Sequence, residues 1–184
     1  MGTTYGSRYP ALDVIRQAIE DAHPGTVVEG YEHRSETTLV IWPEQIRSVA
    51  LFLRDAGLWR FALLADIAGV DWPGREKRFE VVYNLYSVAN HLRLRLKVRV
   101  AENEPVPSVV SVWSSANWHE REVFDMFGVT FTDHPDLRRI LMPEDWQGHP
   151  QRKDYPLEGP GELLMENPID WLKLRQARDQ ADLE

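Results

Sequence analysis

The sequence contains no cysteine among its 184 residues. Disulfide bonds are therefore excluded, and we expect no iron–sulfur cluster on this chain, because cysteine thiolates are the principal ligands of such clusters and of many structural zinc sites. No apolar run approaches the roughly 18 residues of a membrane helix, and the first residues lack the basic and then apolar order of a secretory signal. We therefore expect a cytoplasmic protein that meets a membrane only through partners.

Recognisable catalytic and nucleotide-binding motifs are also absent. The sequence contains neither G-x-G-x-x-G nor a phosphate-binding loop, and no G-x-S-x-G that would mark a nucleophilic serine. Gly159-Pro160-Gly161 cannot replace such a loop, because proline lacks the backbone N–H that a phosphate needs. A formal net charge of −8 argues against nucleic-acid binding, which requires a basic surface. We expect no catalytic residue, bound cofactor or metal ligand of the chain's own.

The sequence does contain the pattern of a globular domain, with 43% hydrophobic and 27% charged residues. Apolar residues recur at helical spacing in the segments 10–25 and 43–57, each opened by a proline and closed by a glycine. Alternating or continuous apolar segments predict strands at 27–32, 37–42, 61–70, 78–86 and 92–100, and the first two form a hairpin. A third helix is expected over 117–128.

The order of these elements predicts an α+β fold. We expect a two-layer sandwich, with a mainly antiparallel sheet and helices on one of its faces, followed by an extended proline-rich motif segment and a C-terminal tail. The expected divisions are a flexible leader (1–9), an α+β core domain (10–128), a motif segment covering the core (129–157) and the tail (158–184). In the tail, Asn167-Pro168 predicts the start of a short helix whose apolar face is thin, so we expect it to dock on partner subunits.

The predicted strand at 92–100 has four cations on one face, opposite a face of leucine and valine. These cations are Arg93, Arg95, Lys97 and Arg99. Same-face neighbours in a strand lie roughly 7 Å apart, so the charges repel one another unless water or carboxylates separate them. The strip is therefore either a solvated outer face of the sheet or a surface that docks on an acidic partner.

The segment 118–157 combines aromatic residues of a buried type with dense charge, and prolines divide it into short pieces. It opens with the third helix, where Asn117 and Glu120 have the spacing of a capping box and Gly128 stands where a left-handed C-terminal residue is expected. Arg121 can meet Asp125 one turn further along the helix. Taken alone, this pattern describes a surface helix with charge pairs.

Two motifs in this segment carry a stronger signal. The first is Glu120-Arg121-Glu122, Asp125-Met126-Phe127, His134, Arg138 and Ile140-Leu141, and the second is Gly148-His149-Pro150 with Arg152-Lys153-Asp154-Tyr155-Pro156. Together they resemble the signature of the 30 kDa, or C, subunit of respiratory complex I, the proton-translocating NADH:quinone oxidoreductase. Similarity extends back to about residue 60 through Ala65-Asp66 and Gly69-Val70-Asp71, while Gln151 departs from the apolar residue that is usual in that family.

The resemblance implies a set of signature residues that we expect to act at a subunit interface. These are Glu120, Arg121, Glu122, Asp125, Phe127, Gly128, His134, Pro135, Asp136, Arg138, Arg139, Gly148, His149, Pro150, Arg152, Lys153, Asp154, Tyr155 and Pro156. Among them, four cations would donate to carboxylates of a partner, namely Arg138, Arg139, Arg152 and Lys153. Four carboxylates would orient those cations or accept partner donors, namely Glu120, Glu122, Asp136 and Asp154.

The resemblance also implies a place for the chain. It would be a scaffold and assembly subunit without redox chemistry of its own, packed against the D (49 kDa) subunit that forms much of the quinone cavity. The complex so implied uses FMN, iron–sulfur clusters, NADH and a quinone, all carried by other chains. This chain would then be a peripheral membrane protein on the cytoplasmic side of the cell membrane.

Two alternatives stay open at this point. The chain could be the equivalent subunit of a membrane-bound hydrogenase or a ferredoxin:quinone oxidoreductase, because other chains select the electron donor and acceptor. From another class, a small metal-dependent enzyme could use His119, Glu122 and His134. The spacing is not H-E-x-x-H, since Val123 stands where the second histidine would be.

Overall fold

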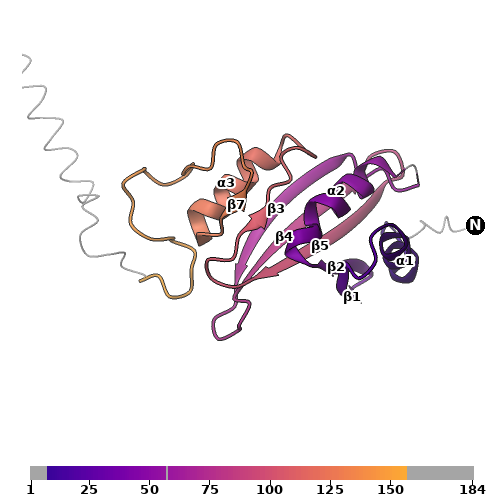
Figure 1. The fold of residues 1–184 in the computed structure, drawn as a ribbon, viewed down its shortest axis with the longest axis horizontal. Coiled ribbons are helices and arrows are strands. Elements are labelled where there is room, and N and C mark those ends of the chain that lie inside the picture. The colour runs from indigo at the N-terminus through magenta and orange to yellow at the C-terminus, as the bar shows by residue number, and fades with distance from the viewer. Residues whose placement is uncertain (1–7, 57, 157–184) are drawn as a thin grey trace, which may run out of the picture.

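The computed structural model describes residues 8–56 and 58–156, so the expected tail with its helix, and most of the expected leader, lie outside the described residues. The described elements (Figure 1) are α1 (Leu12–Ala22), β1 (Val27–His33), β2 (Glu36–Ile41), the 3₁₀ helix η1 (Pro43–Gln45), α2 (Ile46–Asp55), β3 (Leu63–Asp71), β4 (Phe79–Ser87), β5 (Leu92–Val100), β6 (Val106–Pro107), α3 (Ala116–Phe127) and β7 (Phe131–Thr132). The predicted helices and strands within this range are present, with small differences in their bounds. The short strands β6 and β7 were not predicted.

The five longer strands form one sheet in the order β1-β2-β5-β4-β3. The pairs β1–β2, β3–β4 and β4–β5 are antiparallel, whereas β2 and β5 run parallel. The sheet is therefore mixed but mainly antiparallel, which confirms the predicted α+β fold class. The parallel pair β6–β7 stands apart and joins the end of β5 to the start of the motif segment.

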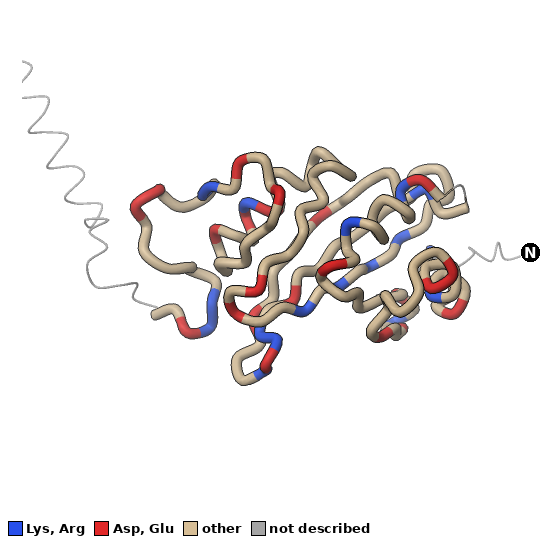
Figure 2. Tube along the Cα trace, in the orientation of Figure 1, with Lys and Arg blue, Asp and Glu red and all other residues tan. Residues whose placement is uncertain are grey.

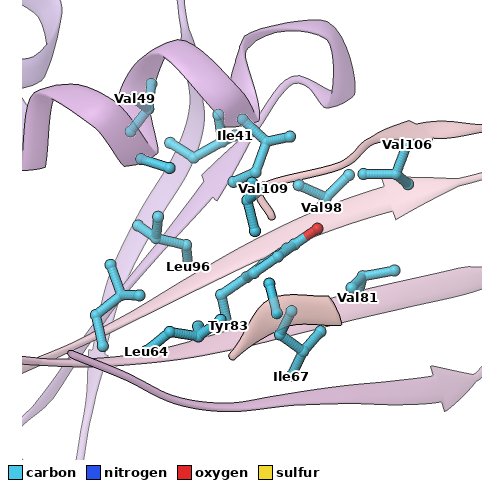
Figure 3. Packing of buried hydrophobic residues seen from close by; sticks show 14 of the residues in the cluster. Ile41, Val49, Leu64, Ile67, Val81, Tyr83, Leu96, Val98, Val106 and Val109 are labelled. Atoms are coloured by element: carbon cyan, nitrogen blue, oxygen red, sulfur yellow. The ribbon is translucent and has the colours of Figure 1, made fainter. Parts of the chain in front are cut away.

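The helices pack on one face of the sheet. Gly30 of β1 faces Leu12 of α1, and Gly69 of β3 faces Phe127 of α3. Figure 3 shows Val49 of α2 near Ile41 and Leu96 of the sheet. Ile41, Val49, Leu96 and Phe127 belong to one continuous buried apolar cluster, against which Leu12 packs. This cluster accounts for most of the hydrophobic burial in the domain. Within the described residues, no helix is both long and apolar enough to cross a membrane.

Figure 2 marks the basic residues along β5. They alternate with buried leucine and valine residues of the core, so the basic strip lies on the opposite face of the sheet. Three of its cations form ion pairs within the chain: Arg95 with Glu36 (2.8 Å), Lys97 with Glu80 (3.1 Å), and Arg99 with Glu80 and Glu29 (both 2.9 Å). Burial of Glu80 raises the pKa of its carboxyl, but the two adjacent cations outweigh this effect and hold the pKa below its ordinary value. Three of the four cations are therefore balanced by carboxylates of this chain, and docking of the strip on an acidic partner stays a prediction.

The contact between Gly69 and Phe127 fixes how closely α3 approaches β3. A Cβ atom at position 69 would lie against Cδ2 and Cε2 of the Phe127 ring, closer than real Cβ contacts come. We expect Gly69→Ala to lower the free energy of unfolding by about 1–3 kcal/mol, because overpacking forces the ring and helix to shift. Urea denaturation of the full chain measures this loss.

A second substitution separates this clash from a general effect on the strand. Phe127→Leu removes the ring atoms that the added methyl group at position 69 would meet, so the double variant should be more stable than the sum of the two single losses predicts. Strict additivity of the two losses would contradict a clash at this contact.

Candidate functional site

The helix α3 is the base of the site, and it differs from the expected surface helix. It begins at Ala116 after Ser115, so Asn117 is not its cap, and the Glu120 carboxyl accepts the N–H of Val109 instead of closing a capping box. Glu120 and Asp125 are fully buried, and Arg121 is 8% exposed. Buried charges need partners, so the question is which groups these side chains meet.

Asp125 meets the returning motif segment. Its Oδ2 accepts three consecutive backbone N–H groups, from Ile140 (3.1 Å), Leu141 (2.8 Å) and Met142 (2.8 Å). Its Oδ1 accepts the Arg139 guanidinium at 2.6 Å. Burial alone would raise the pKa of Asp125, but these donors outweigh it and hold the pKa below its ordinary value. One carboxylate thus fixes the backbone of a proline-rich loop to the core.

The two arginines beside Asp125 extend this attachment through carbonyl groups. Arg139 also donates to the carbonyls of Trp146 (2.9 Å) and Gly148 (3.0 Å). Arg121 does not pair with Asp125 as expected; it donates to the carbonyls of residues 138 (3.0 Å) and 139 (2.8 Å). Guanidinium groups present several donors in one plane, which lets a single side chain bridge two carbonyls.

A second attachment lies at the C-terminal end of α3. Gly128 ends the helix in the left-handed region, at φ 77°, and a Cβ there would collide with Arg152 and His149. Arg152 donates to the Phe127 carbonyl (2.6 Å) and pairs with Glu102 (2.8 Å). His149 Nδ1 lies 2.9 Å from the Asp125 carbonyl, and burial lowers the pKa of His149, so the neutral ring donates from Nδ1.

A third attachment uses residues that the sequence did not single out as a pair. Asp71, at the end of β3, accepts both Arg78 Nε (2.7 Å) and Arg78 Nη2 (2.8 Å) in a forked ion pair, and it also accepts the backbone N–H of Lys153 (2.7 Å). Arg78 in turn pairs with Asp154 (2.8 Å). Asp71 and Arg78 flank the turn between β3 and β4, and that spacing is the signal that could have predicted their contact.

These contacts change the role expected for two cations. Arg139 and Arg152 donate to groups of this chain, so they are not free donors for a partner's carboxylates. The unusual Gln151 fits without strain, since its side chain is exposed while its N–H donates to the Met126 carbonyl (3.1 Å). Residues 129–156, the described part of the motif segment, form the open loop that leaves α3 at the end of the molecule opposite α1 (Figure 1).

The other signature residues lie on or near the outer side of this loop. Exposed are Glu122, Pro135, Asp136, Arg138, Lys153, Asp154 and Pro156, while Pro150 and Tyr155 are half-buried. Arg138 pairs only with its neighbour Asp136 (2.9 Å) among the described residues, and its side chain is 62% exposed. Two large apolar side chains of α3 and this loop are also exposed: Trp118 of α3 by 58%, and Leu141 of the loop by 60%. The Arg121 guanidinium lies over the Trp118 ring, at 5.3 Å from its centroid.

The structure does not assemble the alternative metal site. His119 points to Asp66 (3.7 Å), Glu122 is exposed, and the buried His134 ring lies beside the Asn117 carbonyl (3.2 Å). Across the described ranges, no group of three or more His, Cys, Asp or Glu side chains has a metal-binding arrangement. The hypothesis of a metal-dependent enzyme built on these three residues is therefore wrong.

Comparison with known proteins agrees with the motifs. The sequence matches the family described as respiratory-chain NADH dehydrogenase, 30 Kd subunit, over residues 39–161. It is 53% identical over 147 residues to the C subunit of NADH-quinone oxidoreductase from Roseiflexus sp. (strain RS-1), covering 79% of this chain and 82% of that protein. The protein of the same name from Rhodospirillum rubrum is 46% identical over 159 residues, covering 86% and 75%. The one from Roseiflexus castenholzii is 53% identical over 150 residues, covering 80% and 86%.

The matched range includes both motifs and the attachments that fix the loop to the core. The similarity to relatives extends over most of this chain and most of each relative. The chain therefore belongs to the family of 30 kDa subunits of the respiratory-chain NADH dehydrogenase, the C subunits of NADH-quinone oxidoreductase.

Proposed function

We propose that this chain is a non-redox scaffold and assembly subunit in the peripheral arm of a proton-translocating NADH:quinone oxidoreductase. It packs against the D (49 kDa) subunit, on the cytoplasmic side of the membrane, while FMN, the iron–sulfur clusters, NADH and the quinone are bound by other chains. Family membership supports the assignment to this complex. The complete lack of cysteine supports the assignment of the clusters to other chains.

The observation that carries the scaffold role is that buried and partly buried charges of the chain form contacts with the chain itself. Asp125 and Asp71 accept backbone N–H groups of the loop 129–156, and the Asp125 carboxylate also accepts the guanidinium of Arg139. A loop fixed in this way loses little conformational entropy when it binds a partner. The same contacts leave an outer surface that combines charge with exposed apolar groups, which we call the loop surface and define as Trp118, Arg138 and Leu141.

The loop surface has the composition of an interface anchor. Tryptophan and arginine are enriched among residues that dominate binding energy, and two exposed large apolar side chains gain free energy when a partner covers them. We therefore place the contact with the D subunit here. The basic strip of β5 is a weaker candidate because three of its cations are already paired within the chain.

Removing the two apolar anchors should weaken assembly without weakening the fold. For Trp118→Ser combined with Leu141→Ser, we expect the affinity for partner subunits to fall on the order of a thousandfold, because well-packed anchors contribute about 2 kcal/mol or more each and every 1.4 kcal/mol is tenfold. Thermal unfolding of the isolated chain should change little, because both side chains are largely exposed. The measurement is recovery of partner subunits with the tagged chain from native membranes.

Leu58→Ser is the matched control, because Leu58 is 69% exposed but lies in the connection between α2 and β3. It should leave recovery unchanged. Equal loss in both variants, or normal recovery in the double variant, would contradict the placement of the interface.

The assignment to the complex is tested by the same purification of the unaltered chain. We expect flavin-, cluster- and quinone-site subunits in the eluate, with NADH-to-quinone activity. Recovery with hydrogenase subunits, or with a ferredoxin-linked reductase, would move the chain to a related machine. Recovery alone under gentle detergent would overturn the scaffold role.

A further inference from the structure

Three buried oxygen atoms between the sheet and α3 have no hydrogen-bond partner among the described residues. They are Glu120 Oε2 and Asn117 Oδ1 on α3, and the Tyr83 hydroxyl on β4. Glu120 is fully buried and Tyr83 is 1% exposed. Polar atoms so deeply buried are rarely left unpaired in folded proteins, so this group needs a physical explanation.

The Glu120 carboxyl lies close enough to the Tyr83 hydroxyl to affect its pKa, and Asn117 stands on the same helix as Glu120. Asn117 and Glu120 are three residues apart on α3, so their side chains lie on the same side of the helix. Figure 3 shows the Tyr83 ring in the core, with its hydroxyl end directed toward Val98 and the segment from Val106 to Val109. Glu120 Oε1 accepts the N–H of Val109 at 2.7 Å. The charge of Glu120 adds to burial in raising the pKa of Tyr83, which stays a neutral phenol.

No cation among the described residues balances Glu120. His134 Nε2 lies 4.0 Å from Oε2, but its Nδ1 accepts the N–H of Asp136 at 3.1 Å. That ring is thus the neutral tautomer that donates from Nε2 to the Asn117 carbonyl (3.2 Å). Arg47 of α2 is the other cation near Glu120. It is paired with Asp133 (2.9 Å) and donates to the Ser108 carbonyl (2.8 Å).

A buried carboxylate without a counter-ion is costly, and a carboxyl group in this position takes up a proton instead. Burial raises the pKa of Glu120 to about 7, although Ser108, the Val109 N–H and Arg47 each favour the ionised form. A protonated Oε2 is a donor, yet neither the Tyr83 hydroxyl nor Asn117 Oδ1 accepts from it directly. A water molecule makes about three hydrogen bonds in such sites, which matches the three unpaired atoms.

We propose that Glu120, Tyr83 and Asn117 form an internal site that binds one proton and one ordered water molecule, with the proton on the Glu120 carboxyl in mildly acidic solution. The site lies inside the domain, apart from the loop surface, and it does not depend on the proposed scaffold role. Its ligands are a proton and a water molecule.

Carbon-13 NMR of the full chain, with label in the glutamate side-chain carboxyl groups, tests the proton. We expect one glutamate signal in the protonated position near pH 6 that moves to the ionised position between about pH 6 and 8. This signal should be missing in Glu120→Gln. It should persist in Glu122→Gln, which alters an exposed carboxyl on the same helix. A Glu120 signal that stays ionised from about pH 5 upward would overturn the proposal.

Tyr83→Phe tests the water. The hydroxyl makes no direct hydrogen bond to Glu120, so a shared water is the route by which it would donate to the carboxylate. Its removal should shift the Glu120 titration midpoint upward, because the ionised form loses a relayed donor. A midpoint unchanged in Tyr83→Phe, with the protonated signal still present, would overturn the shared water.

Discussion

Asp125→Ala is expected to lower the free energy of unfolding of the isolated chain by about 3–5 kcal/mol. The carboxylate is fully buried and accepts the guanidinium of Arg139 together with three backbone N–H groups. Its removal leaves a largely buried charge and three donors without an acceptor, and breaking a buried ion pair from one side has a cost of this size. Urea denaturation at pH 7, with wild type measured in parallel, gives the difference.

Two further variants show where that loss comes from. Asp125→Asn keeps an oxygen for the backbone donors but loses the charge opposite Arg139, so we expect an intermediate loss. Arg138 precedes Arg139 on the loop, and its side chain is 62% exposed. Arg138→Ala should therefore change the free energy of unfolding by only about 0.5 kcal/mol or less. An Asp125→Ala variant as stable as Arg138→Ala would show that the loop does not depend on this carboxylate.

The same variants distinguish folding from assembly. Asp125→Ala should reduce incorporation by loosening the loop, and Arg138→Ala should reduce it by altering the loop surface while the fold stays intact. In both cases, the NADH-to-quinone rate per assembled complex should be unchanged. Normal assembly with lost quinone reduction would contradict the scaffold role and point to a catalytic one.

The elements that the sequence predicted are those specified by local patterns. The alternation of β5 depends only on its own residues, and the hairpin β1–β2 depends on a short polar turn. The parallel pairing of β2 with β5 was beyond such reasoning, because the chain passes through α2, β3 and β4 before these strands meet. Nothing local to either strand marks its distant neighbour.

In the candidate site, too, local patterns identified the residues but not their distant contacts. Its residues could be named from the motif, but their partners could not. Arg121 was expected to meet Asp125 and meets two carbonyls instead, and a backbone carbonyl has no signal in the sequence. Asp125 was expected to pair along its own helix, whereas its partners arrive from residues 139–142. On an exposed helix, Arg121 and Asp125 could have paired with each other. Because both are buried under the loop, they meet groups of the loop instead.

Glu120 and Asp125 are two acids on one buried helix, and their surroundings drive them to opposite charge states. Asp125 accepts four donors, one of them cationic, and its pKa is held below its ordinary value. Glu120 accepts the N–H of Val109 and has no cation paired with it among the described residues, so its pKa is raised to about 7. Only the second acid should therefore make stability depend on pH near neutrality.

The Glu120 carboxyl should make the folded chain less stable as the pH rises. Its folded-state pKa of about 7 lies above the ordinary value of 4.5, so the unfolded chain releases this proton first. The neutral carboxyl therefore gives its full stabilisation below about pH 4.5, and that stabilisation is lost as the pH rises through about 7. A pKa difference of this size corresponds to roughly 3 kcal/mol.

Glu120→Gln isolates this effect, because glutamine has a similar shape and cannot ionise. The quantity to follow is the free energy of unfolding of wild type minus that of Glu120→Gln. This difference should fall by roughly 3 kcal/mol as the pH rises from about 4.5 to about 8. The lowered pKa of His149 affects both proteins and cancels in the difference, and Asp71 and Asp125 titrate in more acidic solution. If the free energies of unfolding of wild type and Glu120→Gln change in parallel with pH, Glu120 is ionised in the folded chain over this range. The buried carboxylate would then need a counter-charge that Arg47 and His134 do not supply.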